Sequence, residues 1–264
     1  MEHEPVILEI QVQLEYAFER ACSVLLQIEA AARPEQVIRQ AHIAVTPAGH
    51  FARVPAQDGF GERIWLSVAG RMLADYRATV AIDRPAHDPA ALAAVPLHRL
   101  PGEAVQYLLP SRYCQSHQFV DFVESQFGTL SGGTKVAAIC DWVAGHLSYV
   151  PGASHSGTTA IDTFHAGEGI CRDYAHLMIT LARAADIPAR IASVYAPGVT
   201  PPDFHAVAEV YLEGGWQLFD PTGMAQPDEI AVIGIGRDSG DVAFLTAFGP
   251  LEMIGQSVTV QAVA

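Results

Sequence analysis

Apolar and polar residues follow two different periods along the chain. Up to about residue 105 they alternate in short runs, most clearly over 6–14, 64–68 and 76–82. A period of two is typical of half-buried strands, and the Pro- and Gly-containing stretches between the runs are typical of turns. Residues 1–105 are therefore predicted to form a β-sandwich-like N-terminal domain.

Beyond residue 105 the apolar positions recur every three or four residues, which indicates amphipathic helices. One stripe consists of Val136, Ile139, Cys140, Val143 and Leu147. Thr134 is the expected N-cap of that helix. A second helix is expected to begin at Cys171 and to end near Asp186, because Ile187-Pro188 follows.

Three strand-like runs come after these helices, at 191–195, 206–212 and 216–219. Helices followed by an antiparallel sheet indicate an α+β fold. Residues 106–264 are therefore predicted to form a second domain of that class. The predicted boundary lies among the prolines between about 95 and 110.

Composition narrows the possible partners. The 264 residues are 50% hydrophobic and carry a formal net charge of -14, from 15 Lys and Arg against 29 Asp and Glu. Because phosphate binding requires clustered basic residues, no nucleic acid is expected as a partner, and no anionic membrane surface. No apolar run approaches the roughly 20 residues of a membrane span, and no cleavable signal pattern is visible. Self-association of the chain stays open.

The four cysteines stand at 22, 114, 140 and 171. They form no CxxC pair and no spacing typical of metal ligands, so no metal and no cofactor are expected. Nor do they look like the disulfide framework of a small secreted domain. We therefore expect a reducing, cytoplasmic location, in which a reactive thiol stays free.

Cys171 has the sequence setting of a nucleophile. It follows Gly167-Glu168-Gly169-Ile170 and begins the second predicted helix. The unpaired N–H groups and partial positive charge of a helix N-terminus favour a thiolate, which is the reactive form of a thiol. Those N–H groups can also bind the oxyanion of a tetrahedral intermediate. A buried, unreactive packing role is the ordinary alternative for a cysteine, and it is the interpretation adopted for Cys22 and Cys140.

His205 and Asp220 complete an ordered Cys, His, Asp set. His205 begins one predicted strand and Asp220 follows the next. A two-residue turn at Gly214-Gly215 would place Asp220 about 13 Å along the strand from His205, which is too far. A register with Tyr211 opposite Trp216 makes His205 and Asp220 diagonal neighbours, about 7 Å apart at Cβ. We therefore predict that register, through a four-residue loop or a bulge.

These segments resemble the transglutaminase-like superfamily, whose core is related to papain-like cysteine proteases. The matching stretches are Gly169-Ile170-Cys171-Arg172-Asp173-Tyr174-Ala175-His176-Leu177, His205-Ala206-Val207-Ala208-Glu209-Val210-Tyr211, and Trp216 with Phe219-Asp220-Pro221-Thr222. Residues 107–114 are similar to the lead-in of bacterial members that carry an N-terminal β domain. The resemblance implies that Cys171 is the nucleophile, His205 the general base and acid, and Asp220 the residue that orients His205. It leaves the second oxyanion donor open, with Tyr149 and Trp142 as candidates.

The leading hypothesis is a cysteine hydrolase that cleaves a peptide, isopeptide or related amide through a thioester. Acyl transfer to an amine, as in protein cross-linking, would use the same groups and stays an alternative. A non-catalytic binding module of the same fold is a second alternative. A metal site that combines Cys171 with His165, His176 or the segment 114–117 matches no standard ligand set.

Overall fold

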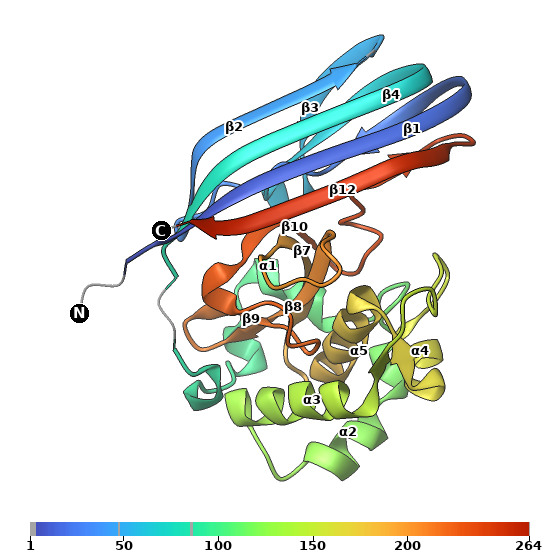
Figure 1. Ribbon diagram of the computed structural model, residues 1–264. Coiled ribbons are helices and arrows are strands. Elements are labelled where there is room, and N and C mark those ends of the chain that lie inside the picture. The colour runs from blue at the N-terminus through green and yellow to red at the C-terminus, as the bar shows by residue number, and fades with distance from the viewer. Residues whose placement is uncertain (1–3, 47, 85–86, 264) are drawn as a thin grey trace.

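In the computed structural model, which describes residues 4–46, 48–84 and 87–263, a large antiparallel sheet lies across a smaller sheet and its helices (Figure 1). This is the predicted α+β class, with a β-rich N-terminal region. Within the described ranges, no helix is long and apolar enough to cross a membrane.

The large sheet has six strands, and its path runs β11-β1-β4-β2, with β12 paired to β1 and β3 paired to β4. The strands are β1 (Val6–Leu26), β2 (Gln36–Thr46), β3 (His50–Pro55), β4 (Glu62–Ile82), β11 (Leu245–Ala247) and β12 (Glu252–Val263). The two longest, β1 and β4, have 21 residues each, so the short predicted runs are parts of longer strands.

The long strands bend back on themselves, as Figure 1 shows at the end of β1 and β4 far from the chain ends. The bend coincides with a register shift between Phe18 and Cys22, opposite Gly70, whose φ is +72°. A positive φ favours glycine, which allows the turn. Alternate residues from both halves then share one core, which contains Leu8, Ile10, Val12, Leu14, Val24, Leu26, Leu66, Met72 and Tyr76.

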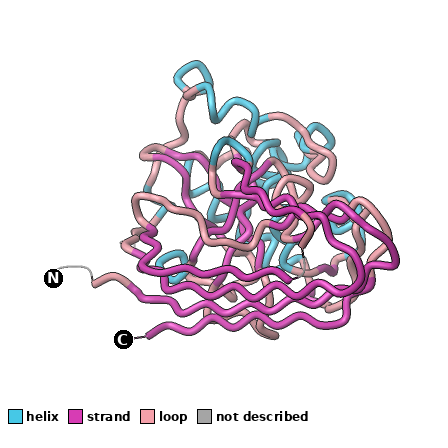
Figure 2. The backbone as a smooth tube through the Cα atoms, turned by 90° about the horizontal axis from the view of Figure 1, so that it is seen from above, coloured by secondary structure: helices cyan, strands magenta, loops and turns pink. Residues whose placement is uncertain are grey.

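The strand β12 joins the two ends of the chain. It pairs antiparallel with β1, from Ile7 opposite Val263 to Ala17 opposite Glu252. Figure 2 shows these strands running side by side along one margin of the molecule. The sequence boundary near residue 105 did not anticipate that a strand this late in the chain would complete the first sheet.

The smaller sheet carries the strands predicted for the second half, in the order β10-β7-β8-β9. Its strands are β7 (Ala189–Tyr195), β8 (His205–Leu212), β9 (Gly215–Phe219) and β10 (Ala231–Gly236), and a separate short parallel pair is formed by β5 (Ser148–Tyr149) and β6 (Glu168–Gly169). The helices are α1 (Gly102–Val105), α2 (Val120–Phe127), α3 (Gly132–His146), α4 (Ala160–Ala166) and α5 (Cys171–Ala184). Single 3-10 turns occur at Gln57–Gly59, Pro89–Ala91, Leu97–Arg99, Gln106–Leu108, Ser116–Gln118 and Pro227–Glu229.

Helix α3 begins earlier than the sequence pattern indicates. Its N-cap position is Ser131, and Thr134, the predicted N-cap, lies inside the helix and donates its hydroxyl to the Ala90 carbonyl at 3.1 Å. The reason is packing: a Cβ at Gly133 would lie 1.8 Å from the Pro89 carbonyl oxygen, so only glycine fits there. The Gly pair therefore serves close contact with the preceding segment instead of ending the helix.

The two layers share one seam. Tyr195 of β7 and Ile233 of β10 belong to the core of the large sheet. Beside them, the buried Glu209 of β8 accepts from Arg33 at 2.8 Å and from Arg190 at 2.6 Å. Burial raises the pKa of Glu209, but the two guanidinium groups outweigh it and hold that pKa below its usual range.

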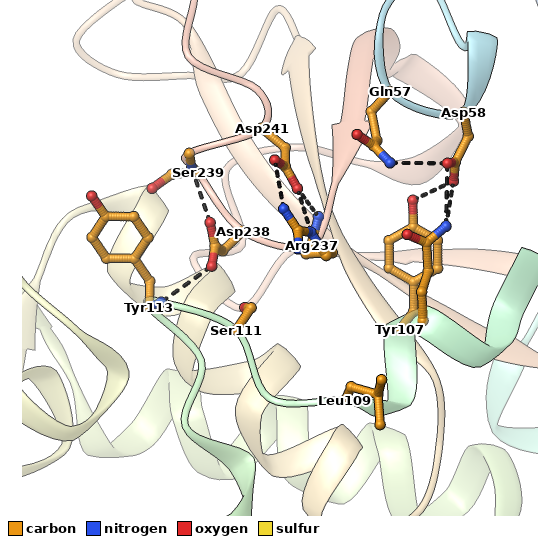
Figure 3. Close-up of polar contacts among 12 residues, drawn as sticks. Gln57, Asp58, Tyr107, Leu109, Ser111, Tyr113, Arg237, Asp238, Ser239 and Asp241 are labelled. Atoms are coloured by element: carbon orange, nitrogen blue, oxygen red, sulfur yellow. Dashed lines mark hydrogen bonds and ion pairs between the residues drawn. The ribbon is translucent and has the colours of Figure 1, made fainter.

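Helix α5 is bonded near its C-terminal end to the segment between α1 and α2. The buried Arg183 donates to the Leu109 carbonyl at 3.2 Å and to the Ser111 hydroxyl at 3.1 Å. Figure 3 shows the same segment held by Asp238, which accepts from the Tyr113 N–H at 3.1 Å. These contacts fix the helix whose first residue is Cys171.

Candidate active site

Cys171 lies at the N-terminus of α5, as predicted, and is partly exposed. The buried Asp173 shapes this helix start: its Oδ2 accepts from the Ile170 N–H at 2.9 Å and its Oδ1 from the Ser154 hydroxyl at 2.9 Å. A Cβ at Gly169 would lie 2.7 Å from the Asp173 Cβ, so a glycine is required here. The entry to the helix is therefore fixed by buried contacts and not by the exposed loop alone.

The register between β8 and β9 is the predicted one. Tyr211 lies opposite Trp216, and the ladder continues to Ala208 opposite Phe219. The turn itself is shorter than predicted, because Leu212 also pairs with Gly215 and only two residues connect the strands. A φ of +92° at Gly214 permits this tight turn.

His205 and Asp220 are brought into direct contact by this register. Nε2 of His205 lies 2.8 Å from Oδ2 of Asp220, and both side chains are almost completely buried. The carboxylate also accepts from the Thr222 N–H at 3.0 Å, from the Thr222 hydroxyl at 2.7 Å and from the Ala225 N–H at 2.8 Å. These donors fix the carboxylate, which in turn fixes the imidazole ring.

The electrostatics of this pair favour an imidazolium facing a carboxylate. Burial lowers the pKa of His205, but the hydrogen bond to Asp220 and the neighbouring Cys171 thiol outweigh it and raise that pKa to about 9. Burial raises the pKa of Asp220, and the contacts with His205 and Thr222 reverse this and bring it below its usual range. The two partners are therefore oppositely charged near neutral pH.

The other ring nitrogen of His205, Nδ1, is buried and has no hydrogen-bond partner among the described residues. Cys171 is the neighbour whose thiol and charge act on this ring. The imidazole therefore has one nitrogen held by Asp220 and the other available toward Cys171. This arrangement can move a proton between sulfur and nitrogen.

Of the two candidate oxyanion donors, Tyr149 is the one next to Cys171. Burial raises the pKa of Tyr149 to about 12; the charge of Cys171 adds to the rise, and a hydrogen bond from the Cys171 N–H opposes it. The hydroxyl thus faces both the backbone N–H and the sulfur of Cys171. Trp142 lies elsewhere, in an aromatic cluster where it stacks on His146 with ring centroids 4.3 Å apart.

The remaining thiols and histidines singled out by the sequence stay outside the site. Burial raises the pKa of Cys114 to about 11 and that of Cys140 to about 12, so both stay protonated. Cys22 is buried in the core of the large sheet. Burial lowers the pKa of His176 to about 3, and its Nε2 accepts from the Ser239 N–H at 3.1 Å. In the described part of the chain, no group of three or more His, Cys, Asp or Glu side chains is arranged to hold a metal ion.

Sequence reasoning missed the residues that hold the site in place. Thr222 and Ala225 fix the carboxylate of Asp220, and Asp173 with Ser154 fixes the start of α5. The Asp-Pro-Thr run at 220–222 carried a signal, since Asp and Thr in such turns bond to nearby backbone groups. The contact between Ser154 and Asp173 had no such signal, because the two residues lie in different segments and no local pattern shows that these segments meet.

Three comparisons place the chain among known proteins. Residues 101–221 match the model of the transglutaminase-like superfamily. A crystal structure of a protein from Cytophaga hutchinsonii, described as a putative cysteine protease, is 31% identical, has a TM-score of 0.94 and covers 99% of this chain and 92% of that chain. An uncharacterized protein of Mycobacterium leprae is 32% identical over 120 residues, which are 41% of this chain and 42% of that protein. The match thus spans less than half the length of this curated relative.

A further structure, the periplasmic domain of TgpA from Pseudomonas aeruginosa, is 18% identical, with a TM-score of 0.44 over 86% of this chain and 94% of that domain. The Cytophaga structure, by contrast, follows this chain through both sheets and the helices. The likeness therefore extends to the N-terminal region, beyond the residues that the family model matches.

Proposed function

This chain belongs to the transglutaminase-like superfamily, and from that premise we propose that it hydrolyses an amide bond of a peptide, isopeptide or related substrate through a thioester on Cys171. One observation carries the proposal. Nε2 of the His205 ring is held by Asp220 at 2.8 Å, Nδ1 is buried without another partner among the described residues, and the thiol at the N-terminus of α5 acts on the same ring.

In the first half of the reaction, the sulfur of Cys171, whose proton has passed to Nδ1 of His205, attacks the carbonyl carbon of the amide. The tetrahedral intermediate collapses when the C–N bond breaks, and the proton on Nδ1 moves to the leaving amine. The products are a free amine and an acyl group bound to sulfur as a thioester. Asp220 stabilises the imidazolium and keeps its proton-bearing Nε2 oriented.

Water completes the reaction. His205 takes a proton from a water molecule, whose oxygen adds to the thioester carbonyl. The C–S bond then breaks, and the proton stays on Nδ1 of His205, so that the imidazolium again lies beside the sulfur of Cys171. The net change is amide plus water to carboxylic acid plus amine, and the enzyme is regenerated.

Two donors can stabilise the negative oxygen of each tetrahedral intermediate. The backbone N–H of Cys171 lies in the first turn of α5, where N–H groups lack intrahelical acceptors. The hydroxyl of Tyr149 is the second, because a pKa of about 12 keeps it protonated and able to donate. Removal of one such donor typically lowers kcat by about 100-fold or more.

The test combines a protein substrate with isotopically labelled water. Hydrolysis predicts that 18O from water enters the new carboxyl group, and that Cys171→Ala abolishes this incorporation. A product that instead carries an added primary amine, without 18O, would replace hydrolysis by acyl transfer. Absence of any covalent adduct of Cys171 with iodoacetamide at neutral pH, in folded protein, would support a binding module without catalysis.

A further inference from the structure

The loop between β7 and β8, which leads directly into His205, carries a second chemical feature. We propose that Asp203 selects substrates that bear a protonated amine next to the amide that is cleaved. This inference rests on the proposed function, since it assigns the substrate class of the same site. Asp203 would touch the substrate through its carboxylate and take no part in the covalent steps.

The carboxylate of Asp203 is fixed in place. The residue lies two positions before His205, on the loop that leads into β8. Its Oδ1 accepts from the Phe204 N–H at 2.7 Å and from Nε2 of Gln256 at 2.5 Å. Because Gln256 belongs to β12, the large sheet supports the loop from behind. The side chain remains solvent-exposed, so a ligand can reach it.

The charge of Asp203 acts on the groups around the nucleophile. It contributes to the raised pKa of Tyr149, whose hydroxyl adjoins Cys171, after burial and the effects of Cys171 itself. It likewise contributes, after burial, to the raised pKa of Tyr16 on the large sheet. A charged group of a substrate bound to Cys171 would therefore lie in the field of this carboxylate.

Asp203 has no cation beside it in the described structure. Burial raises its pKa, and only the Phe204 N–H and the Gln256 amide oppose that rise. The buried Glu209, by contrast, pairs with Arg33 and Arg190. A carboxylate that is partly desolvated and lacks a positive partner gains most from a cation that a ligand supplies.

The neighbouring basic residue does not fill this role. Arg172 follows Cys171 directly, but its guanidinium donates to the Ser154 hydroxyl at 2.6 Å and to the His155 carbonyl at 3.0 Å. The Arg172 side chain is thus bound to the loop between β5 and α4. Asp203 is the one charged residue of the β7–β8 loop, residues 196–204. Its negative carboxylate is complementary to the positive charge of an ammonium group.

The experiment uses thiol reagents of three charges, so that no natural substrate is needed. Neutral methyl methanethiosulfonate, its cationic trimethylammonioethyl analogue and its anionic sulfonatoethyl analogue each form a mixed disulfide with a thiolate and release methanesulfinate. Rates of modification are followed at Cys171 by peptide mass spectrometry. The readout is the ratio of the cationic to the neutral rate.

We expect Asp203→Asn to lower that ratio about three- to tenfold, the range of a single partly exposed charge pair. The matched control is Asp121→Asn on α2, an exposed carboxylate on a surface helix, which makes the same change in net charge and should leave the ratio as it is. An unchanged ratio in Asp203→Asn would overturn the inference.

A second measurement needs no variant. In the unmodified protein, the ratio of cationic to neutral rates should fall as NaCl is raised from about 0.02 to about 0.5 M, because salt screens exposed charges. A ratio that is flat with salt would also overturn the inference. Failure of the neutral reagent to modify Cys171 would instead contradict the proposed function, so the two failures are distinguishable.

Discussion

At the scale of single residues, the site is organised around one carboxylate. Asp220 receives hydrogen bonds from His205, Thr222 and the Ala225 N–H, and its charge raises the pKa of the imidazole that it holds. Since His205 is buried, that charge is little screened by water. The same contact that orients the ring therefore also decides its protonation.

The first prediction concerns the nucleophile. Cys171→Ala should lower amide hydrolysis by about 1,000-fold or more, because members of a nucleophile–base pair act as a unit. Its effect on the free energy of unfolding should be within about 1 kcal/mol, since the thiol is partly exposed and small. Initial rates and urea unfolding of the two proteins check this. Residual activity near the wild-type level would show that the chemistry lies elsewhere.

The second prediction concerns pH. The pKa of His205 rises from 6.5 to about 9 on folding, so its contribution to stability is complete below pH 6.5 and is lost as the pH rises through about 9. The loss amounts to about 3 kcal/mol at most. Urea unfolding of the wild type at pH 6, 8 and 10 should show this decline, and His205→Asn should lack it. Parallel curves for the two proteins would contradict the charged pair.

The contact between His205 and Asp220 was predicted by requiring their side chains to meet, which selected the register with Tyr211 opposite Trp216. The glycine pair alone suggested a turn that would have kept the two residues apart. The sequence could not choose between Tyr149 and Trp142 as neighbours of the thiol. Both are aromatic residues in the region before Cys171, and only the pairing of β5 with β6 brings Tyr149 beside it. Contacts that depend on a short, irregular pairing leave no periodic signal.

At the scale of elements, the start of α5 is the part that the chemistry depends on most. Asp173 stands three positions after the N-cap Ile170 and bonds back to its N–H, while Ser154 approaches from a loop. A shift of the helix start would move the sulfur of Cys171 together with the N–H group that we propose binds the oxyanion. Stability and reactivity are therefore coupled at this helix end.

The third prediction tests that coupling. Asp173→Ala should lower the free energy of unfolding by about 1–3 kcal/mol, because it removes a buried acceptor from two donors, and should slow alkylation of Cys171 by neutral iodoacetamide. The matched control is Asp162→Ala, which removes the equivalent acceptor from the exposed start of α4. It should cost less than about 1 kcal/mol and leave the alkylation rate unchanged. Equal effects of the two substitutions on that rate would refute a special role for Asp173.

Helix and strand identities in the second half followed from the pattern, whereas their boundaries did not. α5 begins at Cys171 as expected, but α3 begins at Gly132 because Gly133 packs against the Pro89 carbonyl. Glycine discourages a helix by its backbone freedom, and here tertiary contact outweighs that local preference. The close approach of Gly133 to Pro89 joins two distant segments, so the local sequence pattern could not predict it.

At the scale of the whole molecule, the two layers are joined by a charged cluster inside an apolar seam. Glu209 of β8 pairs with Arg190 of the same sheet and with Arg33 of the segment between β1 and β2. The guanidinium of Arg190 also lies 3.9 Å from the centre of the Trp216 ring. These groups connect the large sheet to the strand that carries His205.

The fourth prediction follows from this cluster. Glu209→Gln should lower the free energy of unfolding by about 3–5 kcal/mol, because it leaves the buried guanidinium of Arg190 without its carboxylate. The control is Glu62→Gln, whose side chain is 55% exposed and pairs with the exposed Arg53; it should change stability by less than about 1 kcal/mol. Chemical denaturation measures both. A small loss for Glu209→Gln would mean that the seam depends on apolar packing alone.

The overall arrangement was less predictable than the site. Alternation indicated strands in the first part of the chain, but it carries no information on which strand becomes the neighbour of β1. The pairing of β1 with β12 joins residues about as far apart in the chain as possible. Long-range pairing depends on the total shape of the molecule, which local periods do not encode.

That pairing also constrains how the protein can acquire its shape during synthesis. A ribosome delivers β1 first, yet β1 can gain its β12 neighbour only after the elements from β2 to β11 have emerged. Contacts between such distant segments close slowly, because a long loop must be ordered before they form. The loop that precedes His205 is held by Gln256 of β12. Its final ordering therefore waits for β12, and a chain that still lacks this strand should have a less ordered thiol site.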